Sequence, residues 1–207
     1  MNDKRRAEEK KAKDKKEAQE RNGTVVICMD LQGVLLVPSI DASSIYCKTK
    51  LAVHNFTPYN MVTKDAVRFV WHEAEGGLTS NEFTCCIIDH LSSLSGTNKI
   101  VLYSDQWLRL SKQNSVQASA LSAFSLQREC EVQLKYLVKG HTHMEVDSMH
   151  SLIKRKLKNI PIYSPMDYLT IFRTSSVSPR PYEVMGLNHC FFKNYGQVST
   201  FKTIRPG

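Results

Sequence analysis

Two short runs of almost uninterrupted apolar residues mark the centre of a predicted sheet. TVVICMD (24–30) and KIVLYSD (99–105) are rich in β-branched side chains, and each ends on an aspartate. Runs of this length and composition are typical of strands that are buried on both faces. Between them, SIYCKTKLAVHNF (44–56) and DAVRFVWHE (65–73) alternate apolar and polar residues. Alternation predicts strands, and we expect these two to pair antiparallel across a loop at 57–64.

Helical spacing of apolar residues follows the later strands. Thr79 or Ser80 can cap a first helix, because Glu82 stands in its first turn and Gly96 follows its end. Further helices are predicted at 111–130, 143–157 and 166–173, with a strand at 131–140. This order of elements specifies an α/β fold with helices on both faces of the sheet. It is the order of the ribonuclease H-like fold, so we predict a mixed five-stranded sheet whose first three strands are antiparallel.

A charged segment precedes the first strand. Residues 1–22 hold nine basic and six acidic residues and show no apolar stripe. We therefore expect a peripheral tail, helical or disordered, that has nothing to bury and is dispensable for folding. The ribonuclease H-like domain would then span 23–182, and 183–207 would form a C-terminal extension.

The charge balance indicates a class of partner. Lys and Arg total 28 against 20 Asp and Glu, which gives a net charge of +8. A basic body favours a polyanionic partner, DNA first, while a plain role in solubility stays open. The residues expected to contact phosphates without reading sequence are Lys48, Lys50, Arg109, Lys112, Lys154, Arg155 and Lys156.

Composition also excludes several classes of protein. No stretch approaches the ~18 apolar residues of a membrane helix, so no membrane partner is expected. The charged N-terminus lacks the apolar core of a secretory signal. The six cysteines show no CxxC spacing, which argues against zinc ribbons and disulfide frameworks. We expect reduced thiols and a nuclear or cytoplasmic location, not secretion; a homo-oligomer stays open.

Three acids are candidates for chemistry. Asp30 and Asp105 each end a buried apolar strand, and the carboxyl ends of strands are where open α/β sheets bind ligands. Asp147 stands on the predicted helix after the fifth strand, with His150 one turn later on the same face. Clustered carboxylates repel one another unless they share hard divalent cations, here two Mg²⁺ or Mn²⁺ ions. Two such ions can assist the attacking and leaving oxygens of a phosphodiester, so we predict these acids as catalytic metal ligands. The plainer interpretation of each acid is a turn former or helix cap.

Short motifs carry a resemblance to a known family. They are MDLQ (29–32), YSDQ (103–106), QNS (113–115), WHE (71–73), NE (81–82), GHTHMEVDSMH (140–150) and IYSP (162–165). From about Thr24 to Tyr182 the chain resembles an uncharacterised transposon-derived domain that looks like the ribonuclease H-like catalytic domain of a cut-and-paste transposase. The resemblance implies metal-dependent DNA strand cleavage or transfer. The residues that match its motif blocks are Asp30, Gln32, Asp105, Gln113, Asn114, Gly140, His141 and Asp147. Gln32, Asn114, His141 and His150 are expected beside the acids as supporting partners, and His143 and His150 could orient water or phosphate.

The chain departs from that family in two places. QWLRLSK (106–112) replaces a more compact stretch, so the geometry of that loop is open. Lys154 stands where the family often has glutamate, and if that glutamate were the third ligand this copy would be inactive. Lys154 could instead contact DNA phosphate or take the place of one ion by its charge. The family's N-terminal Cys/His-rich and DNA-binding portions are absent, so the chain could be a truncated or domesticated remnant.

Three alternative interpretations stay open. The first is a non-catalytic nucleic-acid-binding or assembly module of the same fold. The second is a metallophosphoesterase, suggested by GHTH (140–143), although the Asp-x-His and Asn-His-Asp motifs of that class are absent. The third is a haloacid-dehalogenase strand at MDLQGVLL (29–36), where Gln32 replaces the second aspartate that the class requires.

Overall fold

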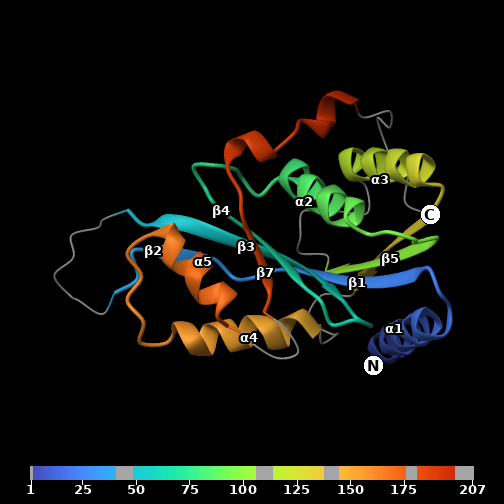
Figure 1. Ribbon diagram of the computed structural model, residues 1–207, viewed down its shortest axis with the longest axis horizontal. Coiled ribbons are helices and arrows are strands. Elements are labelled where there is room, and N and C mark those ends of the chain that lie inside the picture. The colour runs from blue at the N-terminus through green and yellow to red at the C-terminus, as the bar shows by residue number, and fades with distance from the viewer. Residues whose placement is uncertain (1, 41–48, 106–113, 138–144, 176–180, 199–207) are drawn as a thin grey trace.

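One mixed sheet with helices on both faces forms the body of the protein (Figure 1). The computed structural model describes residues 2–40, 49–105, 114–137, 145–175 and 181–198. Its strands are β1 (Thr24–Leu31), β2 (Leu35–Val37), β3 (Leu51–Asn60), β4 (Val67–His72), β5 (Lys99–Asp105), β6 (Glu131–Leu137) and β7 (Glu183–Gly186). Its helices are α1 (Asn2–Glu20), α2 (Ser80–Ser92), α3 (Ser115–Arg128), α4 (Glu145–Leu157) and α5 (Pro165–Arg173), with two short 3₁₀ helices, η1 (His189–Phe191) and η2 (Tyr195–Val198).

The strands lie in the order β6-β5-β1-β3-β4-β7, and β2 pairs with β3 beside this path. β1, β3 and β4 are antiparallel neighbours, as predicted, while β5 and β6 continue the sheet parallel to β1. The predicted count of five strands is wrong, because the described residues form seven. β2 and β7 span only three and four residues, too few for a periodic pattern to reveal them.

Alternation along β1 assigns its side chains to two different cores. Ile27 and Met29 pack in the cluster that contains Phe83 of α2. Val26 and Cys28 pack on the other face, in the cluster of α4 residue Val146. A strand of this kind buries apolar side chains on both faces, which explains its uninterrupted apolar run. Because side chains alternate along a strand, the next residue of β1 on the α4 face is Asp30.

The loop predicted at 57–64 is too long, because β3 continues to Asn60. Pairing with β1 decides this, since Thr57 stands opposite Asp30 and Pro58 opposite Met29. The turn begins only at Asn60, whose side-chain oxygen accepts hydrogen bonds from the two backbone N–H groups of residues 62 and 63. Sequence reasoning took Pro58 and Asn60 as loop markers, while tertiary pairing holds both of them in the strand.

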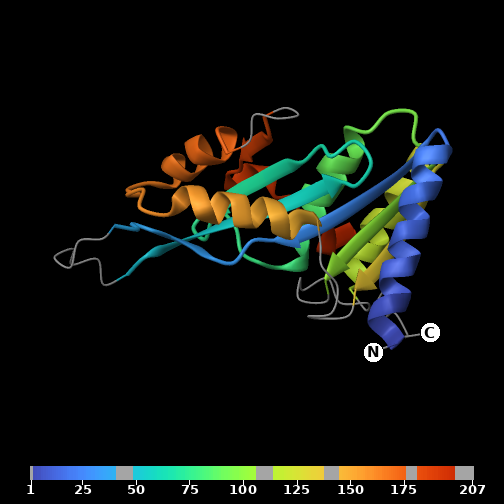
Figure 2. The same ribbon diagram turned by 90° about the horizontal axis from the view of Figure 1, so that it is seen from below.

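The N-terminal segment is a docked helix, so the expectation that it has nothing to bury is wrong. Lys11 and Asp14 of α1 are only 5% and 9% exposed. The Asp14 carboxylate accepts hydrogen bonds from the Tyr103 hydroxyl and from Lys135 Nζ, both at 2.5 Å. Lys11 Nζ lies 2.5 Å from a carboxylate oxygen of Glu145, at the start of α4. Charged contacts therefore hold α1 beside β5, where Figure 2 shows it.

The segment after residue 182, expected as an extension, contributes to the sheet. β7 pairs parallel with β4, and Leu187 is buried against the main core. The Cys85 thiol donates a hydrogen bond to the carbonyl oxygen of Lys193 at 3.3 Å, and the Lys193 backbone N–H donates to Cys85 Sγ at 3.2 Å. These bonds connect the segment after β7 to α2. Across the described residues, no helix has the length and apolar character needed to cross a membrane.

Candidate functional site

The sheet places the two predicted strand-end aspartates next to each other along the backbone. Met29 and Ser104 are the last partners in the parallel register of β1 and β5, and Asp30 and Asp105 directly follow them. Adjacent strands are about 4.8 Å apart, so these two backbone positions are neighbours at the same edge. The side chain of Asp105 lies outside the described part of the chain.

His150 of α4 contacts Asp30 across this edge. Its Nδ1 lies 3.4 Å from Asp30 Oδ2, and the two side chains are 11% and 21% exposed. Asp147 stands one helical turn before His150, so both face the same side of α4. The structure therefore brings Asp30 and His150 together and places Asp147 on the helix face that meets β1.

Four charged residues lie close enough to the buried thiol of Cys28 to affect its pKa. Burial raises the pKa of Cys28 to about 12, and Lys11, Glu145, Asp30 and Asp147 all act on it electrostatically. The three carboxylates raise the pKa and the lysine lowers it. Two of the three predicted acids therefore surround one point between β1 and α4, together with two charged residues that sequence reasoning did not select.

A chain of hydrogen bonds runs from His150 into the sheet. His150 Nε2 lies 3.3 Å from the Thr57 hydroxyl, which donates to Asn55 Oδ1 at 3.4 Å. Asn55 Nδ2 in turn donates to Gln32 Oε1 at 2.8 Å. Asn55 and Thr57 are fully buried, and Gln32 is nearly so. Gln32 is thus linked to His150 through two residues of β3, Asn55 and Thr57.

Donor and acceptor counting explains how this chain is satisfied. Because Thr57 gives its only proton to Asn55, the Thr57 oxygen is an acceptor for His150. An imidazole with protons on both nitrogens then donates to Asp30 and to Thr57 at once. In that arrangement each bond has one donor and one acceptor. The arrangement can hold a proton at Nδ1 of His150, next to a carboxylate at the sheet edge.

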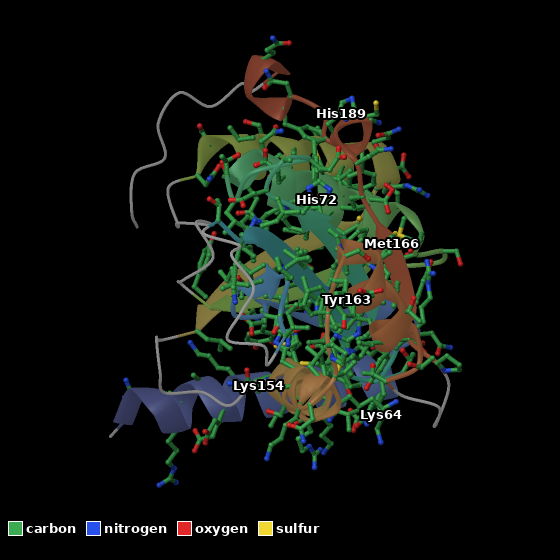
Figure 3. The ribbon with its side chains drawn as sticks, turned by 90° about the vertical axis from the view of Figure 1, so that its left-hand side faces the viewer. Lys64, His72, Lys154, Tyr163, Met166 and His189 are labelled. Atoms are coloured by element: carbon green, nitrogen blue, oxygen red, sulfur yellow. The ribbon has the colours of Figure 1, made fainter. Side chains whose placement is uncertain are left out.

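Lys11 is, with Glu145, one of the two charged residues at this site that sequence reasoning did not select. It comes from the segment expected to be a solvated tail, and its amino group pairs with Glu145. A polar helix with no apolar stripe gives no signal of docking, because its partners are charges far away in the sequence. Lys154, expected above the site, is exposed on α4 (Figure 3).

The other predicted partners of the acids have different positions. Asn114 caps α3, and its Oδ1 accepts from the Gln117 backbone N–H at 3.1 Å. Its side-chain oxygen therefore has a structural role at that helix terminus. His141, His143, Gln113 and Gly140 lie outside the described residues.

The predicted phosphate contacts are exposed wherever the structure describes them. Lys50 precedes β3, and Lys154 and Arg155 stand in the last turns of α4. Lys156 is also exposed, and it donates a hydrogen bond to the carbonyl oxygen of Thr174. Lys48, Arg109 and Lys112 lie outside the described residues.

The chemistry of the donors fits a hard divalent cation, because carboxylate oxygens are the ligands that Mg²⁺ and Mn²⁺ prefer. Within the described residues, no group of three or more His, Cys, Asp and Glu side chains is arranged to hold a metal ion. The third predicted ligand, the side chain of Asp105, lies outside the described residues, so this finding covers only Asp30 and Asp147 among the three predicted ligands.

Comparison with known proteins gives one family match. The model of the family described as Domain of unknown function (DUF7869) matches residues 67–194, more than half of the chain. No curated protein matches. One similar solved chain belongs to the cryoEM structure of the simian T-cell lymphotropic virus intasome in complex with PP2A regulatory subunit B56 gamma. It is 13% identical, with a TM-score of 0.40, and 90% of this chain covers 59% of that chain. At that TM-score the likeness assigns neither fold nor function.

Proposed function

The chain belongs to the family described as Domain of unknown function (DUF7869), and we propose that it is a transposase-derived domain of ribonuclease H-like fold. Its proposed activity is metal-dependent cleavage or transfer of DNA strands. The observation that carries the proposal is the contact of His150 with Asp30 at the carboxyl end of β1, beside the backbone of Asp105. The proposal places the reaction at this edge of the sheet.

The sheet supports the fold part of the proposal. Five strands lie in the order β4-β3-β1-β5-β6, with three antiparallel strands followed by two parallel ones. This is the pattern expected from the order of elements in the sequence, and three motifs of the transposon-derived domain, MDLQ (29–32), WHE (71–73) and YSDQ (103–106), fall at the ends of its strands. β2 and β7 are additions at the side of that five-stranded unit.

Asp30, Asp105 and Asp147 would hold the divalent ions. When bound, such ions supply positive charge that activates an attacking oxygen and stabilises the leaving oxygen of a phosphodiester. The protein's own part is positioning. His150 orients the Asp30 carboxylate and can hold or give up a proton at Nδ1, while Thr57 fixes the other ring nitrogen. Fixed orientation of such partners is what keeps carboxylates in a productive geometry.

Exposed basic residues on α4 fit the DNA part of the proposal. Lys154 follows His150 by about one helical turn, and Arg155 is the next residue; both are exposed on α4. Phosphate contacts of this kind position a duplex without reading its sequence. They also make binding weaken steeply as salt rises.

A second candidate function is a non-catalytic DNA-binding or assembly module of the same fold. The observation that favours it is the ion pair between Lys11 and Glu145, which already places a positive charge beside the acids. A site whose carboxylates are balanced by a lysine has less need of a metal ion.

One cleavage experiment separates these functions. The full chain is incubated with an end-labelled duplex and a DNA hairpin in Mn²⁺, beside Asp30→Asn and the control Asp89→Asn. Asp89 is an exposed acid on α2, on the other face of the sheet. We expect nicking by the unmodified chain and the control, and a loss of about 100-fold or more in Asp30→Asn. Equal nicking by all three, or none from any, would contradict the catalytic proposal. Binding without nicking would support the module instead.

A further inference from the structure

A second cluster of reactive side chains lies beyond the carboxyl end of β7, independent of the acidic site. Glu75, in the turn after β4, accepts two hydrogen bonds from His189 at its Oε2. One comes from the backbone N–H at 2.7 Å and the other from ring Nδ1 at 3.1 Å. The other ring nitrogen, Nε2, lies 3.4 Å from Sγ of Cys190. Figure 3 shows His189 at the opposite end of the view from Lys154.

The carboxylate decides which nitrogen of His189 carries the proton. Glu75 Oε2 can only accept, so Nδ1 is the donor in this contact. In a neutral ring Nε2 then keeps its lone pair, and that lone pair faces the thiol of Cys190. A nucleophile beside a base that a third group orients is the arrangement that activates thiols. The positions of Cys190, His189 and Glu75 meet that description.

Packing around Glu75 holds the cluster in place. A side chain at Gly76 would bring a Cβ atom within 2.6 Å of the Phe192 ring, so only glycine lets Phe192 lie against this turn. The Trp71 indole N–H donates to the carbonyl oxygens of Gly76 and Gly77, at 3.1 Å each. The ring of Phe192 also packs edge-on against Trp71. The turn that carries Glu75 and the segment that carries Cys190 are therefore fixed against each other.

Cys190 differs from the other described cysteines in its exposure. Cys28, Cys85, Cys86 and Cys130 are buried, whereas Cys190 is exposed. Burial raises the pKa of the Cys28, Cys85 and Cys86 thiols, which keeps them protonated and unreactive. Oxidation of a cysteine follows its thiolate character and its accessibility. Among these five residues only Cys190 combines an accessible sulfur with an oriented base.

We propose that Glu75, His189 and Cys190 form a reactive-thiol site at which hydroperoxides oxidise Cys190. The thiol proton of Cys190 moves to Nε2 of His189, and the thiolate attacks one oxygen of hydrogen peroxide. The S–O bond forms as the O–O bond breaks, and the leaving hydroxide takes the proton back from His189 to give water. Sulfur is oxidised from thiol to sulfenic acid, and the peroxide is reduced to water. The side chain of His189 is 76% exposed and Cys190 is exposed as well, so a small oxidant can reach the sulfur and the base beside it.

The test measures sulfenic acid at each of the six cysteines. The full chain is treated with hydrogen peroxide in the presence of dimedone, digested and analysed by mass spectrometry. We expect Cys190 to be labelled first, about tenfold faster than N-acetylcysteine at neutral pH, because Nε2 of His189 stands beside the thiol to accept its proton during the attack, whereas a free thiol has no such base. Labelling of Cys190 at the rate of N-acetylcysteine would overturn the proposal.

Matched variants test the roles of the two partners. Glu75→Gln keeps an acceptor for the backbone N–H of His189 but removes the charge, and we expect labelling of Cys190 to slow about threefold or more. Glu73→Gln is the control, because Glu73 lies in the same turn and accepts only from the backbone of Ala52 among the contacts that the structure describes. His189→Gln changes an exposed side chain, so it should fold and also slow labelling. An unchanged rate in both Glu75→Gln and His189→Gln would overturn the proposal.

Discussion

His150 on α4 and Asp30 at the end of β1 are joined through Nδ1 and Oδ2, 3.4 Å apart, although the two residues are far apart in the sequence. The contact fixes α4 against the sheet edge at the point where β1 and β5 end together. Because Thr57 holds the second ring nitrogen, the ring has little freedom to turn. This pair is the part of the candidate site that the structure defines most completely.

A double-mutant cycle on this pair should show that it is energetically coupled. Asp30→Asn and His150→Gln each remove one partner, and we expect a coupling of about 1 kcal/mol from urea unfolding of the two single variants and the double variant. The exposed pair Lys16 and Glu20, 3.7 Å apart on α1, serves as the control and should couple by about 0.5 kcal/mol or less. A coupling energy no larger than that of the control pair would mean that the contact between His150 and Asp30 does not stabilise the folded protein.

The docking of α1 predicts a stability cost at Asp14. Asp14→Asn removes the charge from bonds with Tyr103 and Lys135 and should lower the free energy of unfolding by about 2 kcal/mol. Glu20→Gln, on the exposed side of the same helix, should change it by less than about 0.5 kcal/mol. Guanidinium unfolding of both variants measures the difference. Equal effects would restore the sequence-based expectation of a dispensable tail.

His90 on α2 predicts how stability depends on pH. Both ring nitrogens are buried without a hydrogen-bond partner among the described residues, and burial lowers the pKa of His90 from 6.5 to about 4. Between those values the unfolded chain binds more protons than the folded one, so the free energy of unfolding falls as pH falls through this window. The loss from neutral pH to about pH 4.5 should reach about 2 kcal/mol.

His90→Leu isolates this contribution, because the leucine cannot take up a proton. Unfolding by urea at the two pH values should show a smaller loss in His90→Leu than in the unmodified chain. Other groups that titrate in the window affect both proteins alike. An identical loss of the free energy of unfolding in both proteins would show that folding does not lower the pKa of His90.

Lys11 predicts a change in metal affinity. Its amino group pairs with Glu145 beside the acids, so Lys11→Met removes a positive charge and frees a carboxylate. We expect Mn²⁺ to bind about tenfold more tightly by calorimetry, since two unit charges about 4 Å apart interact by roughly 1 kcal/mol even in bulk water and by more near a protein surface. Lys10→Met, an exposed neighbour, should leave the affinity unchanged. If both variants bind alike, Lys11 has no influence on the ion.

Local patterns predicted the elements that carry their own signal. β5 spans the expected residues, because an apolar run is visible wherever a strand is buried on both faces. Thr79 and Glu82 form the expected capping box at the start of α2, since both partners lie within one turn. The predicted alignment of Asp147 with His150 on one face of α4 followed from helical periodicity alone.

What the sequence did not show depends on contacts between distant residues. Thr57 joins the site because β3 continues past Phe56 and pairs with β1, and the contact of Asn55 with Gln32 depends on the register of that pairing, which tertiary structure sets. Asp14 is buried because Tyr103 and Lys135 satisfy its charge, and no periodicity records such a match.

The central claim is that a divalent ion binds where β1 and β5 end, and paramagnetic broadening by Mn²⁺ tests it most directly. Small amounts of Mn²⁺ are added to the isotope-labelled chain, and the loss of each backbone amide signal is followed by NMR. The account predicts that Asp30, Ser104 and His150 lose their signals first, and that Asp30→Asn largely abolishes this loss while Asp89→Asn does not. Broadening that begins elsewhere, or that is unchanged in Asp30→Asn, would contradict it.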